Sequence, residues 1–226
     1  GNIQFLRLTF LLLFFTFLGH NLFSADQYWD RDDGNAGAST GSTATGNWNT
    51  SSWNSNSDGS GSNGSWSNGN TAIFSAGSDA TGSSTITADL NDMTLGGVTV
   101  EEGDITIASG SGSLTLSGNA DFNVAEGSTL TITEPLLYGD NTLNKTGKGL
   151  LTIGANNTPG GGATKITQGK IDISSAVNNF TGSIIGAETT KSMLGGDGVV
   201  DSATFGNADG EIDFVSPGLG LSSSMT

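Results

Sequence analysis

The sequence predicts an all-β protein, specifically a β-solenoid with an irregular cap at its N-terminal end. Three observations predict it. Short patches that alternate an apolar residue with Thr recur from Thr71 onward, and Gly-containing turns separate them. The 36 glycines, against only 3 prolines and without a Gly-X-Y period, indicate frequent turns rather than collagen. Beyond the first 25 residues, single Val, Ile and Leu residues supply most of the apolar content, which favours many thin layers over one thick core.

Residues 1–25 are predicted to be a secretory signal peptide. Arg7 supplies a positive charge ahead of an unbroken run of apolar residues and Thr, Leu8–Leu18, and polar residues then end that run. These 11 residues are too few to span a bilayer, which needs roughly 20. A signal anchor is the alternative. We expect cleavage after Ser24 or Ala25, and therefore a secreted protein at an extracellular or outer-membrane surface.

Residues 26–70 are predicted to form the N-terminal cap. Gly, Ser, Asn, Asp and Thr dominate this segment, and that composition alone is typical of disorder. However, Trp29, Trp48, Trp53 and Trp66 punctuate it, and four large rings would be costly to leave in water. We expect them to anchor an ordered cap with loose turns. The alternative is an exposed aromatic platform that stacks on carbohydrate.

Residues 71–226 are predicted to form the solenoid repeats. A β-sandwich remains the alternative, because turn-bounded strands at this spacing occur in sandwiches and barrels too. The strands are short, however, and the Asn, Ser and Thr between them favour stacked polar ladders over long hairpins. No stretch shows a 3.6-residue period, so helix should be nearly absent outside the leader. The predicted strands before the central motif cover residues 72–74, 85–87, 93–95, 98–100, 105–107, 114–116, 122–124 and 130–133.

The central motif is the run LNKTGKGLLTIGANN at residues 143–157, followed by a Gly triplet and the run TKITQGKIDI at residues 164–173. It resembles the autotransporter-associated β-strand repeat. The resemblance implies a right-handed parallel β-helix in the surface-exposed passenger region of a bacterial protein, often held at the outer membrane by a separate C-terminal module. One departure is Thr158-Pro159, where the family tends to place an aromatic residue. The matching positions are Leu143, Lys145, Gly147, Gly149, Leu151, Ile153, Asn156, Gly161, Gly162, Thr164, Ile166, Gly169, Ile171 and Ile173.

The physical interpretation of the motif agrees with this resemblance. Gly147 and Gly149 would allow tight turns between rungs. The Leu151/Ile153 and Ile171/Ile173 pairs would point inward and stack, because alternate residues of a strand share a face. Thr152 and Asp172 would then face solvent.

Few residues could carry catalytic or metal-binding chemistry. The chain has no Cys, and its one His, His20, lies in the leader, which excludes disulfides, His-dependent triads and His or Cys metal sites from the mature protein. A carboxylate-pair mechanism is the alternative, because Asp89, Asp92, Glu101, Glu102 and Asp104 cluster at predicted turns.

Two segments, Asp30–Gly34 and Asn207–Asp213, resemble pieces of calcium loops. Neither completes a loop with a final bidentate Glu, so we interpret both as acidic turns. We therefore predict that the protein is not an enzyme and has no catalytic, cofactor-binding or metal-binding residues.

The sequence thus favours a structural or adhesive cell-surface protein, an adhesin-like autotransporter passenger. The alternative is a carbohydrate-binding or carbohydrate-cleaving extracellular β-helix. Surface glycans or other cells are the expected partners, whereas the net charge of −15 disfavours nucleic acid. The chain starts with Gly1 and stops within a Ser-rich phrase, which indicates a piece of a longer reading frame, with membrane attachment only through a C-terminal region outside it. The oligomeric state stays open.

Overall fold

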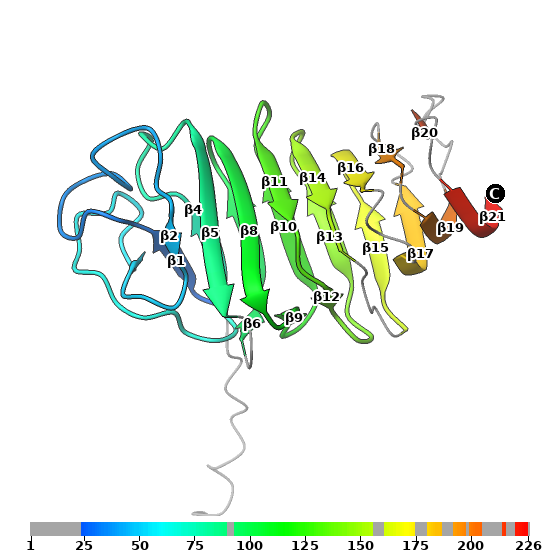
Figure 1. Cartoon of the computed structure of the whole chain (residues 1–226), viewed down its shortest axis with the longest axis horizontal. Helices are drawn as coiled ribbons and strands as arrows, with labels where there is room; N and C mark the ends of the chain where they lie inside the picture. Colours follow the sequence, from blue (N-terminus) through cyan, green and yellow to red (C-terminus); the bar gives the residue numbers. More distant parts are fainter. Residues whose placement is uncertain are drawn as a thin grey trace, which may run out of the picture.

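The computed structural model of the chain is a parallel β-solenoid, as the sequence predicted (Figure 1). Its described residues form strands, turns and bends but no helix. The handedness expected from the family resemblance stays a prediction. The structure describes residues 24–89, 93–155, 161–174, 180–186, 192–197, 199–204, 214–215 and 220–225, so nearly all of the predicted signal peptide lies outside this range.

Three sheets run along the solenoid. The first, sheet A, has ten described strands in the order β21-β19-β17-β15-β13-β10-β7-β4-β1-β3. They are β1 (Asp26–Trp29), β3 (Trp53–Asn54), β4 (Thr71–Phe74), β7 (Gly97–Val100), β10 (Ala120–Val124), β13 (Leu143–Thr146), β15 (Ala163–Ile166), β17 (Phe180–Gly186), β19 (Val199–Thr204) and β21 (Gly220–Met225).

The other two sheets complete the rungs. Sheet B has eight described strands, namely β2 (Gly46–Asn47), β5 (Ser83–Asp89), β8 (Asp104–Ser111), β11 (Thr129–Ile132), β14 (Leu150–Ile153), β16 (Gly169–Ile173), β18 (Ser192–Gly196) and β20 (Phe214–Val215). Sheet C is short and consists of β6 (Thr94–Leu95), β9 (Leu114–Leu116) and β12 (Leu136–Leu137).

The described rungs differ in the sheets to which their strands belong. Around the middle of the chain, each rung takes one strand from sheet A, the next from sheet B and a third from sheet C, as in β7-β8-β9 and β10-β11-β12. From β13 onward the chain passes from sheet B back to sheet A with no third strand among the described residues. Among the described residues, the three-sheet rung is therefore seen from β4 to β12.

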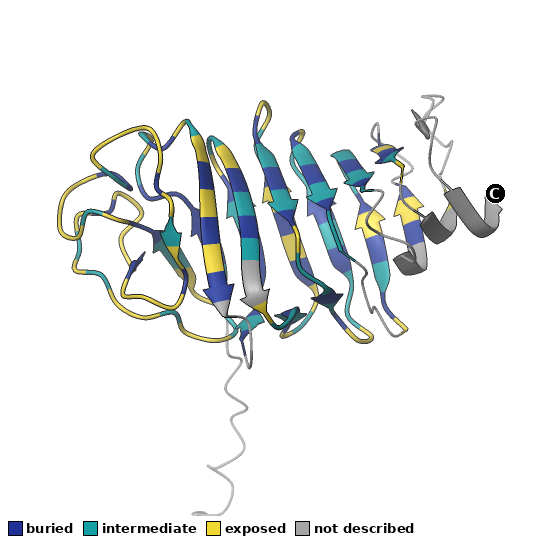
Figure 2. Cartoon of the chain, viewed as in Figure 1, coloured by how far each residue is buried: buried dark blue, intermediate teal, exposed yellow. Residues whose placement is uncertain are grey.

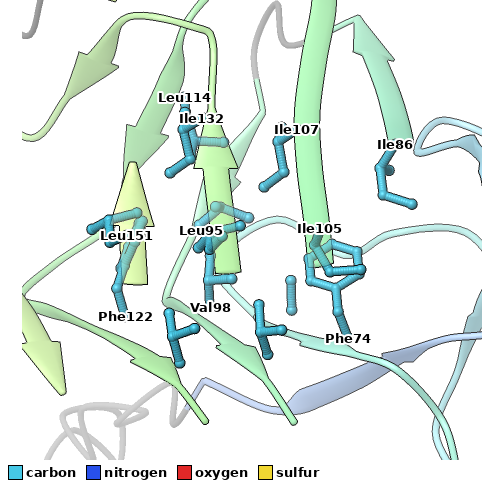
Figure 3. Packing of buried hydrophobic residues seen from close by; sticks show 14 of the residues in the cluster. Phe74, Ile86, Leu95, Val98, Ile105, Ile107, Leu114, Phe122, Ile132 and Leu151 are labelled. Carbon is cyan, nitrogen blue, oxygen red and sulfur yellow. The ribbon is translucent and has the colours of Figure 1, made fainter. Parts of the chain in front are cut away.

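The core consists of apolar residues stacked in register from rung to rung. On sheet B, Ile105 pairs with Leu130, Leu130 with Leu151, and Leu151 with Ile171. All four side chains are buried, and Figure 3 shows Ile105 and Leu151 pointing into the same interior as Phe122 of sheet A. Burial alternates with exposure along the strands (Figure 2), which is the two-residue period of a β-strand. Each fully buried aliphatic side chain contributes about 1.5–3 kcal/mol through removal from water.

The predicted strands are confirmed. Every predicted patch coincides with or overlaps an observed strand. The two predicted inward pairs also stack as expected, Leu151 on Ile171 and Ile153 on Ile173, while Thr152 and Asp172 lie half-buried on the opposite face. The Thr158-Pro159 departure lies outside the described residues.

The two glycines of the central motif serve different needs. Gly147 has a φ of +69°, a left-handed conformation that glycine adopts without steric cost. At Gly149, by contrast, the constraint is space, because a Cβ atom there would lie 2.2 Å from the carbonyl oxygen of Ala125 in the rung below. Only a residue without a side chain lets the two turns stack this closely.

The N-terminal end is covered by the cap. Strand β1 pairs in parallel with β4, and β3 then pairs antiparallel with β1, so the ladder of sheet A ends in a short strand of only two residues. Behind these strands the rings of Trp29, Trp48, Trp53 and Phe74 pack together, with centroid separations between 4.6 and 6.2 Å. The tryptophans therefore anchor an ordered cap, as expected, over an edge that would otherwise be open to pairing.

Candidate functional site

The tryptophans of the cap do not form an exposed platform. Trp29, Trp48 and Trp53 are at most 1% exposed, and the half-buried Trp66 packs edge-on against Trp48 at 5.1 Å. The indole nitrogen of Trp53 also points to the backbone, because its Nε1 donates to the carbonyl of Trp48 at 3.0 Å. The alternative interpretation of these rings as a carbohydrate-stacking surface does not fit the three buried ones.

The acidic segment Asp30–Gly34 is tied into the cap by side-chain hydrogen bonds. Asp30 is fully buried; its Oδ2 accepts from Asn54 Nδ2 at 3.0 Å and its Oδ1 from the backbone N–H of Asp32 at 2.9 Å. Asn54 Nδ2 also lies 2.6 Å from the carbonyl oxygen of Gly61. These contacts hold the loops of the cap to β1 and β3, which is a structural use of the carboxylate.

Burial raises the pKa of Asp32, and the neighbouring carboxylates of Asp30 and Asp79 raise it further. Across the residues that the structure describes, no three His, Cys, Asp or Glu side chains are grouped as a metal site would require. The second calcium-like segment, Asn207–Asp213, falls outside that part of the chain.

The fold keeps three of the turn carboxylates together and separates Asp89 from them. Glu101, Glu102 and Asp104 lie in and next to the turn between β7 and β8, Asp89 ends β5, and Asp92 is not among the described residues. Glu102 Oε1 accepts from Ser75 Oγ at 3.2 Å and from the backbone N–H of Ala80 at 3.0 Å, so it holds the turn to the preceding rung.

Partial desolvation raises the pKa of Glu101, and the carboxylates of Glu102 and Asp26 raise it further. Glu101 therefore has a perturbed titration, but Glu102, its neighbour at the turn, is committed to structural hydrogen bonds. The arrangement accordingly favours a structural role for this turn over a carboxylate pair.

Sequence reasoning missed the burial of Lys145. The side chain is fully buried at an inward position of sheet A, stacked between Phe122 and Ile166. Its Nζ donates to the carbonyls of Thr146 at 2.6 Å, Gly147 at 2.7 Å and Gln168 at 3.3 Å.

Desolvation lowers the pKa of Lys145 to about 8. The left-handed turn at Gly147 presents a carbonyl to the ammonium group, which bridges one rung corner to the next through Gln168. The Lys-x-Gly spacing of the central motif was the signal that could have predicted this burial. A lysine two residues before an obligatory turn can reach the carbonyls of that turn.

A polar groove lies on the outer face of sheet A. It has a volume of about 650 Å³ and crosses β4, β7, β10, β13 and β15, of which β10, β13 and β15 lie side by side in Figure 1. The side chains of Asp121, Asn144 and Lys165 occupy one register along these strands. The groove is lined by Thr71, Gly96, Gly97, Thr99, Asn119, Ala120, Asp121, Asn123, Thr142, Asn144, Thr146 and Lys165.

Part of the groove wall is fixed by side-chain hydrogen bonds that pass between rungs. Thr167 Oγ1 donates to Asn144 Oδ1, and Asn144 Nδ2 donates to Asp121 Oδ1 at 2.8 Å. Just before β10 and β13 begin, the backbone N–H of Thr142 donates to Asn119 Oδ1 at 2.8 Å. These bonds orient the side-chain amides of Asn119 and Asn144. No pattern in the sequence predicted this row, because it depends on which residue of one rung lies above which residue of the next.

No known protein family, no curated protein and no solved structure matches the chain. The similarity to the autotransporter-associated repeat therefore stays a prediction, and the fold rests on the strand arrangement itself. In the part of the chain that the structure describes, no helix is long and apolar enough to cross a membrane.

Proposed function

We propose that this protein is a secreted cell-surface solenoid with a structural or adhesive role, similar to an autotransporter passenger and without catalytic activity. The observation that carries the proposal is the continuous sheet A ladder. Parallel neighbours pair in register from β1 to β15, and the pairing continues with two local shifts to β21.

A ladder of this kind suits a spacer. Each rung contacts chiefly its neighbours, so added rungs lengthen the solenoid along one axis. The outward positions of the strands need not pack and are free to vary, which suits the presentation of a surface to other molecules. The cap supports the same role, because it covers the N-terminal edge and leaves the sides of the solenoid as the available surface.

Surface labelling of producing cells tests the proposal. Antibodies against the solenoid should label intact cells, and externally added protease should remove that signal while a cytoplasmic marker stays protected. Deletion of the gene should also reduce attachment of the cells to a surface or to other cells. Labelling that appears only after permeabilisation would contradict the proposed location.

Carbohydrate binding is the second candidate function, and the polar groove of sheet A is the observation in its favour. Trp29, Trp48 and Trp53 cannot supply it, because their rings are packed inside the protein. If binding occurs, it should therefore depend on the groove and not on Trp48 or Trp53 as exposed surfaces.

A further inference from the structure

We propose that the groove on the outer face of sheet A binds a strand of neutral polysaccharide. The proposal rests on the adhesive function proposed above, because it names the surface through which the solenoid would adhere. Three properties of the groove carry it: its length, its chemistry and the way its polar groups are held.

The groove is long in one direction. It crosses five neighbouring strands from β4 to β15, and adjacent strands of a sheet lie about 4.8 Å apart, so it extends roughly 19 Å along the solenoid axis. At Gly97, which pairs with Thr71, β7 projects no side chain into the groove, and a Cβ atom there would lie 3.0 Å from the carbonyl oxygen of Asp121. A shape of this kind fits an extended chain better than a compact small molecule.

The lining matches a polyhydroxylated ligand. It offers Thr hydroxyls, Asn amides, the carboxylate of Asp121 and the ammonium of Lys165, and its only apolar side chain is that of Ala120. Sugar hydroxyls both donate and accept hydrogen bonds, so each of these groups has a matching partner on a glycan. A lipid chain or an apolar peptide would leave these polar groups without hydrogen-bond partners.

Charge favours a neutral glycan over an acidic one. Asp121 and Lys165 balance each other within the groove, while the whole chain carries a net charge of −15. That net charge repels polyanions such as polyuronates or nucleic acid. A single lysine at one end of the row is not enough to reverse it.

The polar groups at the centre are held in place before any ligand arrives. The bonds from Thr167 to Asn144 and from Asn144 to Asp121 fix one oxygen of the Asp121 carboxylate. Asp121 is exposed, so its other oxygen, Oδ2, can accept from a ligand hydroxyl. Groups that are already ordered lose less entropy on binding, which raises affinity. Thr99 and Lys165 add groups with no bonding partner within the described part of the chain.

Binding of purified full-length protein to a defined set of glycans tests the proposal. The probes are neutral oligosaccharides of glucose, mannose and galactose, with oligogalacturonate and extended polar peptides as competitors. We expect at least one neutral glycan to bind. Asp121→Ala, and Gly97→Gln, which places a side chain over β7, should each weaken that binding at least tenfold by calorimetry. Thr131→Ala and Thr152→Ala, on the outer face of sheet B, are the matched controls and should leave it unchanged.

Lys165→Met keeps the test decisive if a groove variant fails to fold, because this exposed side chain contributes no hydrogen bond or ion pair within the described residues. It should weaken glycan binding while the thermal melt stays that of the wild type. The proposal is overturned if no neutral glycan binds, if oligogalacturonate or peptide binds instead, or if the groove variants bind as the wild type does. If the protein is displayed on cells but binds no glycan, only the groove proposal is contradicted. If it binds glycan but is not displayed on cells, only the proposed function is contradicted.

Discussion

The cap and the central repeat bury their residues in opposite ways. In the cap, a few large rings meet at one place, and Trp53 alone lies 4.6 to 5.7 Å from Trp29, Trp48, Trp66 and Phe74. In the repeat, single aliphatic residues stack in register, and each one meets chiefly the equivalent residue of the rungs above and below. The structure of the cap therefore depends on particular side chains. The structure of the repeat depends on the backbone ladder, and many aliphatic residues can occupy its inward positions.

Trp53→Ala should produce the largest effect, because it removes the ring at the centre of the cap. We expect a loss of about 4 kcal/mol in the free energy of unfolding, the range for a buried aromatic truncated to Ala. Urea denaturation followed by circular dichroism measures it. Trp66→Ala, which removes a half-buried ring at the edge of the same cluster, is the matched control and should cost clearly less. Equal losses from the two variants would contradict a cap centred on Trp53.

Leu151→Ala tests how much one ladder position contributes to the stability of the repeat. The side chain is fully buried between Leu130 and Ile171, so its truncation should cost about 3 kcal/mol. Leu151→Ile should cost under about 1.5 kcal/mol, because a ladder position accepts another aliphatic residue of the same volume. A loss from Leu151→Ile as large as that from Leu151→Ala would mean that side-chain shape, rather than the ladder, specifies the repeat.

The same contrast explains what the sequence could and could not predict. The strands and the inward stacking of Leu151 on Ile171 were predictable, because a two-residue period is local and decides which face each residue takes. The short third sheet formed by β6, β9 and β12 was not predictable as a separate side of the solenoid, since it depends on how the corners turn. The groove row of Asp121, Asn144 and Lys165 was missed because register between rungs is a property of the whole coil. Lys145 was recognised only as a motif position, because lysine is rarely buried without a carboxylate.

Lys145 makes the stability of the repeat depend on pH. Its folded pKa of about 8 lies below the ordinary value of 10.5, so the unfolded chain binds more protons between these values. The stability of the folded protein should therefore rise as the pH increases from 8 toward 10.5, by about 2 kcal/mol between pH 8 and pH 10. Below pH 8 both states are protonated, and the contribution stays at its lowest value.

Lys145→Met isolates this pH dependence from that of the other lysines and the tyrosines. The variant loses the donor to three backbone carbonyls but also the cost of burying a charge, so the informative quantity is the difference from wild type as a function of pH. The stability of the wild type relative to Lys145→Met should grow over this pH range in urea titrations. A constant difference would contradict the burial of a titrating ammonium group.

The smallest effect should come from the surface of the same repeat. Lys148 Nζ lies 3.2 Å from Glu126 Oε2, but the two side chains are 59% and 75% exposed. Exposed ion pairs contribute little because solvent screens them and two flexible side chains must be ordered, so Glu126→Gln should change the free energy of unfolding by less than about 0.5 kcal/mol. High salt should leave the difference from wild type close to zero. A loss above about 1 kcal/mol would mean that the rungs depend on outer side-chain contacts, which the stacked core and backbone ladder make unnecessary.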